Sequence, residues 1–430
     1  MSFASRAPWL VAVATFGLAA CSDGVGADTI STAGAPSGGQ SQAGNSAGSP
    51  GTSGTLATAG SVSGGVGGGS AAAGTASGGT ITTAGTGGAS TAGAAGAGTA
   101  GAAAGGGGTS GSGGAAPSDC SVAPLDPMAT PEVKKLLCYI YNIYGKSVLS
   151  GQQETSWSNP QGDIDYYVTT VGKHPAILGG DFLYQDGNKP GSTTTQRGIA
   201  YWQAGGITMM RFHMGAPPLA DTYDNSKMSV ASFDNLTTDG TSENTSLKSK
   251  LDYMAGELKV MQDANVPVLL VPYHEVDSGA WFWWSKGTGP QFVKLWKYTV
   301  DYINKTKGIH NVIWIMGYGH DGAMPDYYPT GYTDLGGIDQ YDQGKQPFTM
   351  QFTSAKAVVG TVVPIPLHET GTIPQPSAMF PSAAPWVLWN VWATYQNTNA
   401  EGYTWNTPEA IKMAYADSHT VTRETVPNLK

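Results

Sequence analysis

The chain has 430 residues and a formal net charge of −9, and only 12% of its residues are charged. Its few Lys and Arg residues form no basic block, so composition argues against a nucleic-acid partner. Low charge combined with 12 Trp and 20 Tyr indicates a neutral ligand instead.

The first predicted element is an export signal over residues 1–20. Arg6 precedes an apolar run from Ala7 to Ala20 that is too short to remain as a membrane-spanning helix. The run ends Leu-Ala-Ala-Cys21, which resembles the lipobox of bacterial lipoproteins, where the Cys is lipidated. We therefore expect an exported protein, lipid-anchored through Cys21 at the bacterial outer membrane or cell surface, with no other membrane contact. An ordinary signal peptide, and thus secretion, is the alternative.

Residues 21–118 are predicted to form a disordered linker behind this anchor. From residue 22 to residue 118 the chain is almost entirely Gly, Ala, Ser and Thr, without any aromatic residue, Lys, Arg, His or Glu. Such a segment has too little apolar surface to offset the backbone entropy lost on folding. Residues 119–430 hold every Tyr and all Trp except Trp9, and their number suits one α/β barrel.

Short β-prone runs alternate with amphipathic stretches in that second part. The predicted strands are 147–153, 176–182, 206–213, 267–275, 311–319, 335–341, 363–370 and 386–392. Strands that alternate with helices eight times predict the α/β class and a single (β/α)8 TIM barrel. A doubly wound open sheet is the less favoured alternative, because such sheets rarely contain so many units.

Helices are predicted at 131–144, 246–265, 290–307 and 408–422. In the third of these, Phe292, Leu295 and Trp296 begin an i, i+3, i+4 pattern that is typical of a buried face. Cys120 precedes the first helix and Cys138 lies in it. Because an exported protein can keep a disulfide, we expect these two residues to be bonded and to hold the start of the domain to this helix. Two unpaired thiols are the alternative.

Polar and aromatic residues gather where the predicted strands end, the face on which α/β barrels carry their chemistry. Glu275 follows the fourth strand and Glu369 the seventh, so their side chains are expected to face each other across the barrel. Two carboxyl groups can cleave a glycosidic bond when one protonates the leaving oxygen and the other attacks the anomeric carbon. Aromatic residues at 281–284 offer apolar faces for sugar rings. The plainer alternative is that each Glu is a salt-bridge partner.

Three motifs resemble glycoside hydrolase family 26. They are Ser-Gly-Gln-Gln at 150–153, Gly-Ile-Asp-Gln-Tyr-Asp at 337–342, and the run His-Glu-x-x-x-Gly-x-Trp-Phe-Trp-Trp at 274–284. The resemblance covers residues 120–430 in the right order. It implies a (β/α)8 barrel, a retaining endo-β-1,4-mannanase acting on β-mannan polysaccharides, and no metal or organic cofactor. We expect the protein to act as a monomer.

The resemblance also implies roles for single residues. Glu275 would be the general acid/base and Glu369 the nucleophile. His274 and Tyr341 would hydrogen-bond to the nucleophile and orient it.

The same resemblance implies a set of sugar-binding residues. His213 would line the subsite next to the cleavage point. Trp281 would pack near the acid/base, and Trp389 or Trp392 would form the floor of that subsite.

Some positions depart from the family pattern. Val271 stands where many members have Arg, Asp277 stands where Asn is common, and His368 has no role in the pattern. These departures leave other β-glycans open as substrates, such as β-1,3-xylan or mixed-linkage glucan. From a different class, a non-catalytic glycan-binding surface protein is the rival. A zinc-protease motif fails because residue 278 is Ser, and the GxGxxG match at 317–322 lacks a following helix because prolines come next.

Overall fold

The computed structural model describes residues 120–155, 162–183, 190–276, 279, 281–343, 346–382, 384–398 and 402–430. Within these residues, eight parallel strands follow one another in sequence order around a closed barrel. They are β2 (Gly151–Gln153), β3 (Ile177–Asp181), β4 (Ile207–Arg211), β5 (Val268–Val271), β6 (Val312–Tyr318), β7 (Leu335–Gln340), β8 (Leu367–Thr370) and β9 (Trp389–Val391). Gln152 pairs with Val391 and closes the barrel. The predicted (β/α)8 barrel is confirmed, and each expected strand run contains one barrel strand.

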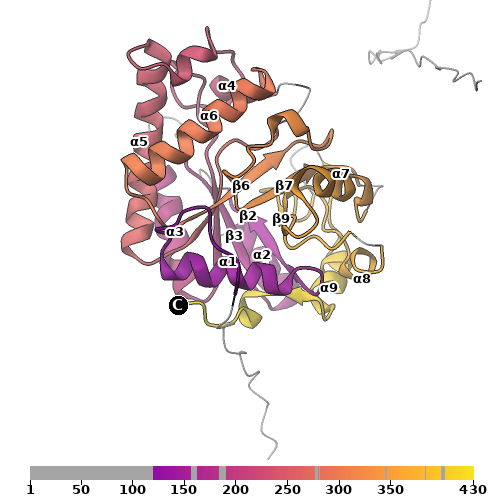
Figure 1. Ribbon diagram of the computed structural model, residues 1–430. Coiled ribbons are helices and arrows are strands. Elements are labelled where there is room, and N and C mark those ends of the chain that lie inside the picture. The colour runs from indigo at the N-terminus through magenta and orange to yellow at the C-terminus, as the bar shows by residue number, and fades with distance from the viewer. Residues whose placement is uncertain are drawn as a thin grey trace, which may run out of the picture. The chain divides into compact units, whose positions relative to one another are not determined.

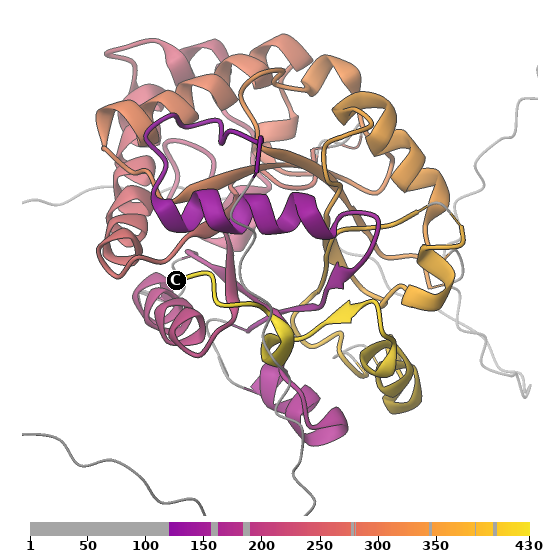
Figure 2. The ribbon, with the colours of Figure 1, turned by 60° about the horizontal axis from the view of Figure 1, so that its bottom comes forward.

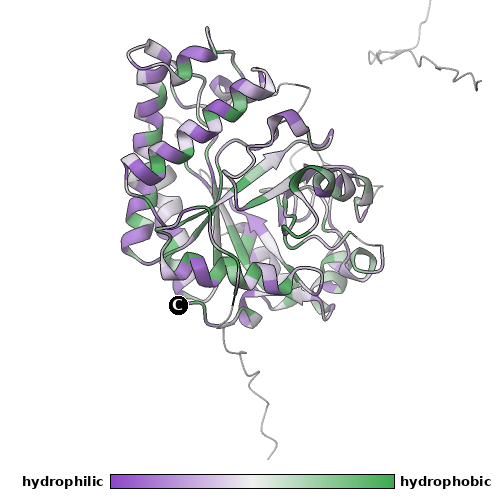
Figure 3. Ribbon diagram, viewed as in Figure 1, coloured by the Kyte–Doolittle hydropathy of each residue, from purple (hydrophilic) through white to green (hydrophobic). Residues whose placement is uncertain are grey.

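Helices cover the outside of the barrel (Figure 1). The longer ones are α2 (Gly162–Val171), α3 (Pro190–Gln203), α5 (Ser242–Asp263), α6 (Gly289–Asp301), α7 (Thr349–Val359) and α9 (Pro408–Ala416), and single turns form α4 (Tyr223–Ser226) and α8 (Pro376–Met379). Their hydrophobic residues lie toward the strands and their hydrophilic residues outward (Figure 3). In α6 the expected residues Phe292, Leu295 and Trp296 are buried, so the predicted face is confirmed.

Several short helical turns complete the list. They are the 3-10 turns Asp234–Thr237, Trp283–Ser285, Pro325–Tyr327 and Arg423–Thr425, and the π-helical turn Tyr302–Thr306. The π-helical turn continues α6, so helical structure persists to nearly the predicted end of that element. After residues 317–322 comes only the 3-10 turn at Pro325–Tyr327, which agrees with a loop rather than a nucleotide-binding helix.

The barrel strands are buried on both faces, because side chains fill the interior and helices cover the exterior. Side chains alternate between these two faces along a strand. On β9, the Nδ2 atom of Asn390 lies 3.4 Å from Oε1 of Gln153. Gly179 leaves room for this polar pair, because a Cβ atom there would lie 2.4 Å from the same Gln153 oxygen.

The helix α1 (Pro131–Ile143) lies across the end of the barrel at which the strands begin (Figure 2). It begins with Pro131 after Thr130, whose side chain accepts a hydrogen bond from Val133 N, as an N-cap residue does. Its inward face is apolar, and Leu136 and Ile140 are fully buried. This helix therefore closes one end of the barrel and leaves the carboxyl ends of the strands for chemistry.

One predicted helix is wrong at its C-terminal end. The segment expected to be helical over 408–422 leaves the helix after Ala416. Asp417 is extended and its Oδ1 accepts a hydrogen bond from His419 N at 2.9 Å, which turns the chain. Thr420–Val421 then form β10, which pairs in parallel with β1 (Val148–Leu149). Two β-branched residues favour this pairing over further helix.

The expected disulfide is not formed, since Cys120 and Cys138 are free thiols. The two side chains nevertheless line the same surface hollow. Burial, together with the adjacent Cys120, raises the pKa of the Cys138 thiol to about 11, which keeps it protonated. Because the thiolate is the reactive form, this environment disfavours bond formation.

The predictions for the N-terminal part of the chain concern residues outside the described ranges. They are the export signal over residues 1–20, the lipidated Cys21 and the linker over residues 21–118. Among the residues that the structure does describe, no helix combines the length and the apolar character needed to cross a membrane.

Candidate active site

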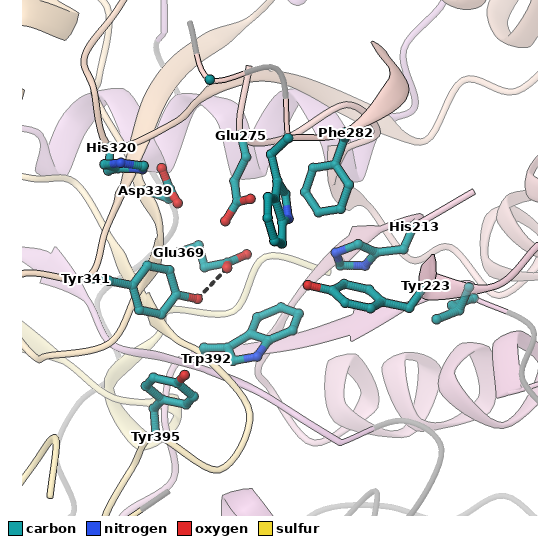
Figure 4. A pocket seen from close by; sticks show the side chains of 13 residues that line it. His213, Tyr223, Glu275, Phe282, His320, Asp339, Tyr341, Glu369, Trp392 and Tyr395 are labelled. Carbon is teal, nitrogen blue, oxygen red and sulfur yellow. Dashed lines mark hydrogen bonds between the residues drawn. The ribbon is translucent and has the colours of Figure 1, made fainter. Parts of the chain in front are cut away.

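A cavity of about 620 Å³ lies at the carboxyl ends of the barrel strands (Figure 4). Its walls come from many separate strand ends and loops. The lining residues are Leu183, His213, Tyr223, Glu275, Gly279, Trp281, Phe282, His320, Asp339, Tyr341, Glu369, Trp392 and Tyr395. Six of the eight residues that the sequence proposed as catalytic or sugar-binding therefore share one cavity, and His274 and Trp389 are the two that do not line it.

Glu369, on β8, is almost fully buried and is held by two partners. The hydroxyl of Tyr341 donates a hydrogen bond to its Oε1, as the sequence predicted (Figure 4). The guanidinium of Arg211, at the end of β4, forms an ion pair with its Oε2. Arg211 also donates from Nη2 to the backbone oxygen of His368 at 3.0 Å. Both partners favour the ionised carboxylate and fix its direction.

Arg211 is a functional residue that the sequence interpretation missed. It is the last residue of β4, but in the sequence it lies inside the predicted strand 206–213, so its position there indicates only core. The side chain is fully buried. A charge buried to this extent needs a partner, and that rule is the signal that could have found it.

Tyr341 remains a hydrogen-bond donor over the whole working pH range. Burial raises the pKa of its hydroxyl well above the usual value, and the charges of Glu275 and Asp339 raise it further. Its proton is therefore retained next to the Glu369 carboxylate.

His274 does not contact the nucleophile, which corrects the role expected for it. Its Nε2 lies 2.9 Å from Nε2 of His213, and the Nδ1 of His213 hydrogen-bonds to a carboxylate oxygen of Asp181. Burial, with the charges of His213 and Arg211, lowers the pKa of His274 well below its usual value, so this imidazole is neutral. Arg211 occupies the place at the nucleophile that was expected for His274.

The buried Asp181 anchors this chain of side chains. Burial alone would raise the pKa of its carboxyl, but the charge and hydrogen bond of His213, with help from Arg211, lower it below the usual value. Asp181 Oδ1 also accepts hydrogen bonds from the backbone N of Leu183 at 2.9 Å and of His213 at 3.3 Å. His213 is thereby fixed in orientation at the cavity wall.

Glu275 and Asp339 bring two more carboxyl groups to Glu369. One oxygen of each of these three side chains lies within 4.8 Å of one oxygen of the other two. In the part of the chain that the structure describes, this is the only group of three acidic, His or Cys side chains close enough to share a cation. Within this group, Glu369 has Arg211 as its counter-ion. The absence of any cofactor stays a prediction.

Glu275 has a strained backbone, with a φ of 52° in the left-handed region. The next residue, Val276, holds this conformation by pairing with β6. Its N donates to Gly317 O and its O accepts from Gly319 N, both at 3.1 Å. The indole of Trp284 donates to His274 O at 2.7 Å on the other side of Glu275. These bonds aim the Glu275 side chain into the cavity (Figure 4).

Aromatic side chains form the walls of the cavity. Trp281 is 50% exposed, and Trp392 lies below Glu369 in the view of Figure 4, with the Arg211 guanidinium 5.2 Å from its ring centre. Tyr223, from the single-turn helix α4, also lines the cavity, with its ring centre 5.4 Å from that of His213. Tyr223 stands in a loop far beyond its strand, so no strand-end rule could predict it.

Trp389 is not part of the cavity, which removes it as a candidate for the subsite floor. Its side chain is fully buried, and its ring lies 6.4 Å from that of Tyr415 in α9. The cause is the alternation along β9. Asn390 points into the barrel, so Trp389 points outward to the helices, and Trp392, beyond the end of the strand, reaches the cavity.

A parallel (β/α)8 barrel with close carboxyl groups and aromatic walls at the carboxyl ends of its strands has the architecture of a glycoside-cleaving enzyme. The sequence profile of glycosyl hydrolase family 26 matches residues 125–425, and the chain belongs to this family. The resemblance drawn from the sequence motifs is confirmed.

Relatives named as mannan endo-1,4-beta-mannosidases are similar to this chain. One from Thermothelomyces thermophilus is 31% identical over 318 residues, covering 70% of this chain and 62% of the relative. The type B protein from Piromyces sp is 30% identical over 279 residues, covering 62% of this chain and 48% of the relative. The chain thus spans less than two thirds of the length of either relative.

Solved structures of the family share the fold. GH26A from Muricauda sp. MAR_2010_75 has a TM-score of 0.62 and 29% identity, covering 69% of this chain and 98% of that chain. A beta-mannanase from a symbiotic protist of the termite Reticulitermes speratus, complexed with gluco-manno-oligosaccharide, has a TM-score of 0.61 and 26% identity, covering 71% of this chain and 97% of that chain.

Proposed function

We propose that this chain is a retaining endo-β-1,4-mannanase that hydrolyses mannan, galactomannan or glucomannan. The observation that carries the proposal is the pair Glu275 and Glu369, with oxygens within 4.8 Å of each other in one aromatic-walled cavity. Retaining glycosidases place their two carboxyl groups about 5–5.5 Å apart, whereas inverting enzymes need a wider gap to admit water. The similarity to mannan endo-1,4-beta-mannosidases supports mannan as the substrate.

The two carboxyl groups divide the reaction between them. Glu369, ionised beside Arg211 and Tyr341, attacks the anomeric carbon and forms a glycosyl ester as the bond to the leaving oxygen breaks. Glu275 gives its proton to that oxygen in the same step. Water then attacks the anomeric carbon, Glu275 takes the proton of this water, and Glu369 is released.

The residues around the pair support binding of a neutral sugar chain. Trp281 and Trp392 present aromatic faces for the apolar sides of sugar rings. His213, with its ring nitrogens bonded to Asp181 and His274, contributes its ring to the cavity wall beside Trp392. Such walls also fit β-1,3-xylan or mixed-linkage glucan, so the choice among glycans is left to experiment.

The experiment is an assay of new reducing ends on mannan, galactomannan, glucomannan, β-1,3-xylan and mixed-linkage glucan. We expect cleavage of the mannans, with a rapid fall in viscosity because cleavage is internal. Early products should keep the β configuration, as read by NMR. Cleavage of another glycan alone would reject the mannan assignment, and binding without cleavage would favour a non-catalytic glycan-binding protein.

Variants of the two carboxylates test the assignment of roles. Glu369→Ala should lose nearly all activity, and added azide should then yield a glycosyl azide of inverted configuration. Glu275→Ala should act better on substrates with good leaving groups than on polysaccharide, because those need little protonation. Glu409→Ala, at an exposed position in α9, is the matched control and should match the wild type. Activity near the wild-type level in both cavity variants would contradict the assignment.

We also propose that the enzyme is exported and anchored at the cell envelope by a lipid on Cys21. The apolar run before Cys21 and the Gly- and Ser-rich segment after it support this location. In a bacterial host, Cys21→Ser should release the protein from the membrane fraction or stall its processing. Recovery of the variant in the membrane fraction, with normal processing, would rule out the anchor.

A further inference from the structure

Asp163, in the first turn of α2, is a buried carboxylate outside the cavity, and the mechanism does not use it. Its two oxygens accept four hydrogen bonds from two different loops. Oδ2 accepts from the N and Oγ1 of Thr155, at 2.7 and 2.8 Å. Oδ1 accepts from the N of Thr394 at 3.1 Å and from Nε2 of Gln396 at 2.9 Å. The carboxylate therefore joins the loop after β2 to the loop after β9.

The loop after β9 is the one that carries two aromatic residues of the cavity. Trp392 and Tyr395 both line the cavity, and Thr394 stands between them. Thr394 has a φ of 70°, a left-handed conformation that a β-branched residue rarely adopts. Such a conformation persists only where its surroundings enforce it, and the hydrogen bond from Thr394 N to Asp163 does so.

The side chain of Asp163 is suited to this task because it is an anion at a helix start. Asp163 is 4% exposed, so its charge requires compensation from hydrogen bonds and from the positive end of the α2 dipole. A neutral amide of the same shape could accept at one side only. Its NH2 group would then face either the two donors of Thr155 or the two donors from Thr394 and Gln396, and those donors would lose their acceptor.

We propose that Asp163 is a positioning residue that fixes Trp392 and Tyr395 in their sugar-binding places by enforcing the strained turn at Thr394. The proposal rests on the function given above, in which Trp392 contacts the sugar chain, and on the place of Tyr395 in the lining of the same cavity. Asp163 acts on substrate affinity through the loop, and it takes no part in bond cleavage at Glu369.

The test compares the full-length wild type with Asp163→Asn and with the matched control Asp165→Asn. Asp165 lies in the same first turn and loses the same charge, but it is exposed. Hydrogen–deuterium exchange of the peptide covering residues 389–398 reports the loop without any need for activity. Steady-state kinetics on mannohexaose then separate KM from kcat.

In Asp163→Asn we expect faster exchange in residues 392–398 and a KM raised about tenfold or more, the scale of losing a hydrogen bond to a charged group. The value of kcat and the pH profile should change little, and Asp165→Asn should match the wild type. The double variant Asp163→Asn with Thr394→Gly should recover part of the lost affinity, because Gly adopts the left-handed conformation without strain.

Wild-type exchange and KM in Asp163→Asn, or equal effects in Asp165→Asn, would overturn the proposal. Should Asp163→Asn fail to fold, Gln396→Leu removes one donor to the same oxygen and should give a smaller rise in KM; an unchanged KM there would also count against it. A wild type that cleaves no mannan would instead reject the proposed function, while the exchange measurement would still decide whether Asp163 holds the loop.

Discussion

The ion pair between Arg211 and Glu369 leads to a prediction about both stability and rate. Arg211→Met keeps most of the length and apolar volume of the side chain but removes its charge. Both side chains are almost fully buried, at 0% and 4% exposure, so water cannot replace the lost partner. Glu369 would then depend on Tyr341 alone.

The size of the effect follows from this burial. Removing one partner of a buried ion pair costs about 3–5 kcal/mol, because the remaining charge stays desolvated. We therefore expect Arg211→Met to lower the free energy of unfolding by roughly that amount at pH 7. The cost should shrink in acid, where Glu369 binds a proton and the unpaired charge disappears. A misdirected nucleophile should also lower kcat by about 100-fold or more.

A double-mutant cycle measures the interaction directly. Urea unfolding at pH 7 would compare the wild type, Arg211→Met, Glu369→Gln and the double variant, with Arg211→Lys as the control that keeps the charge but loses the planar two-point contact. We expect a coupling free energy of at least about 2 kcal/mol between the two sites. Additivity within about 0.5 kcal/mol, or a cost that is unchanged in acid, would refute the reasoning.

Three further predictions concern other parts of the molecule. Tyr341→Phe should lower kcat about 10- to 100-fold, because it removes a hydrogen bond to a carboxylate. The alkaline limb of the pH–rate profile should stay in place, because burial keeps the pKa of this hydroxyl well above its usual value. A shifted alkaline limb would contradict this expectation. Burial lowers the pKa of His368 from 6.5 to about 3 in the folded protein. As the pH decreases below 6.5, the unfolded chain therefore binds a proton that the folded chain does not, and the free energy of unfolding decreases. His368→Phe should remove up to about 1.4 kcal/mol of that decrease per pH unit, which urea unfolding at pH 7 and pH 5 would measure. A chain beginning at Ser118 should melt and cleave like the full chain, whereas one beginning at Tyr144 lacks α1 and should lose about 5 kcal/mol or more of apolar burial; equal melting temperatures would show that α1 adds nothing.

The barrel and the catalytic pair could be predicted from the sequence because both depend on local signals. Buried parallel strands form short apolar runs, and the helices between them show the 3.6-residue period. Once the strands are placed in order, their carboxyl ends must meet at one face, so Glu275, Glu369, Tyr341 and His213 lie together without any knowledge of packing. The helix predicted over 408–422 is too long, because Thr420 and Val421 pair instead with β1, a strand distant in sequence.

The partners of those residues were decided only by the tertiary structure. Arg211 is the last residue of β4 and lies in a run whose sequence indicates core. Its ion pair with Glu369 exists because β4 and β8 face each other across the barrel. Trp389 and Trp392 differ by three positions, and the alternation and end of β9 decide which one reaches the cavity. Sequence thus determined where polar groups gather, since strand order and periodicity are local. Which groups touch depends on side-chain direction and burial, and these exist only once the barrel has closed.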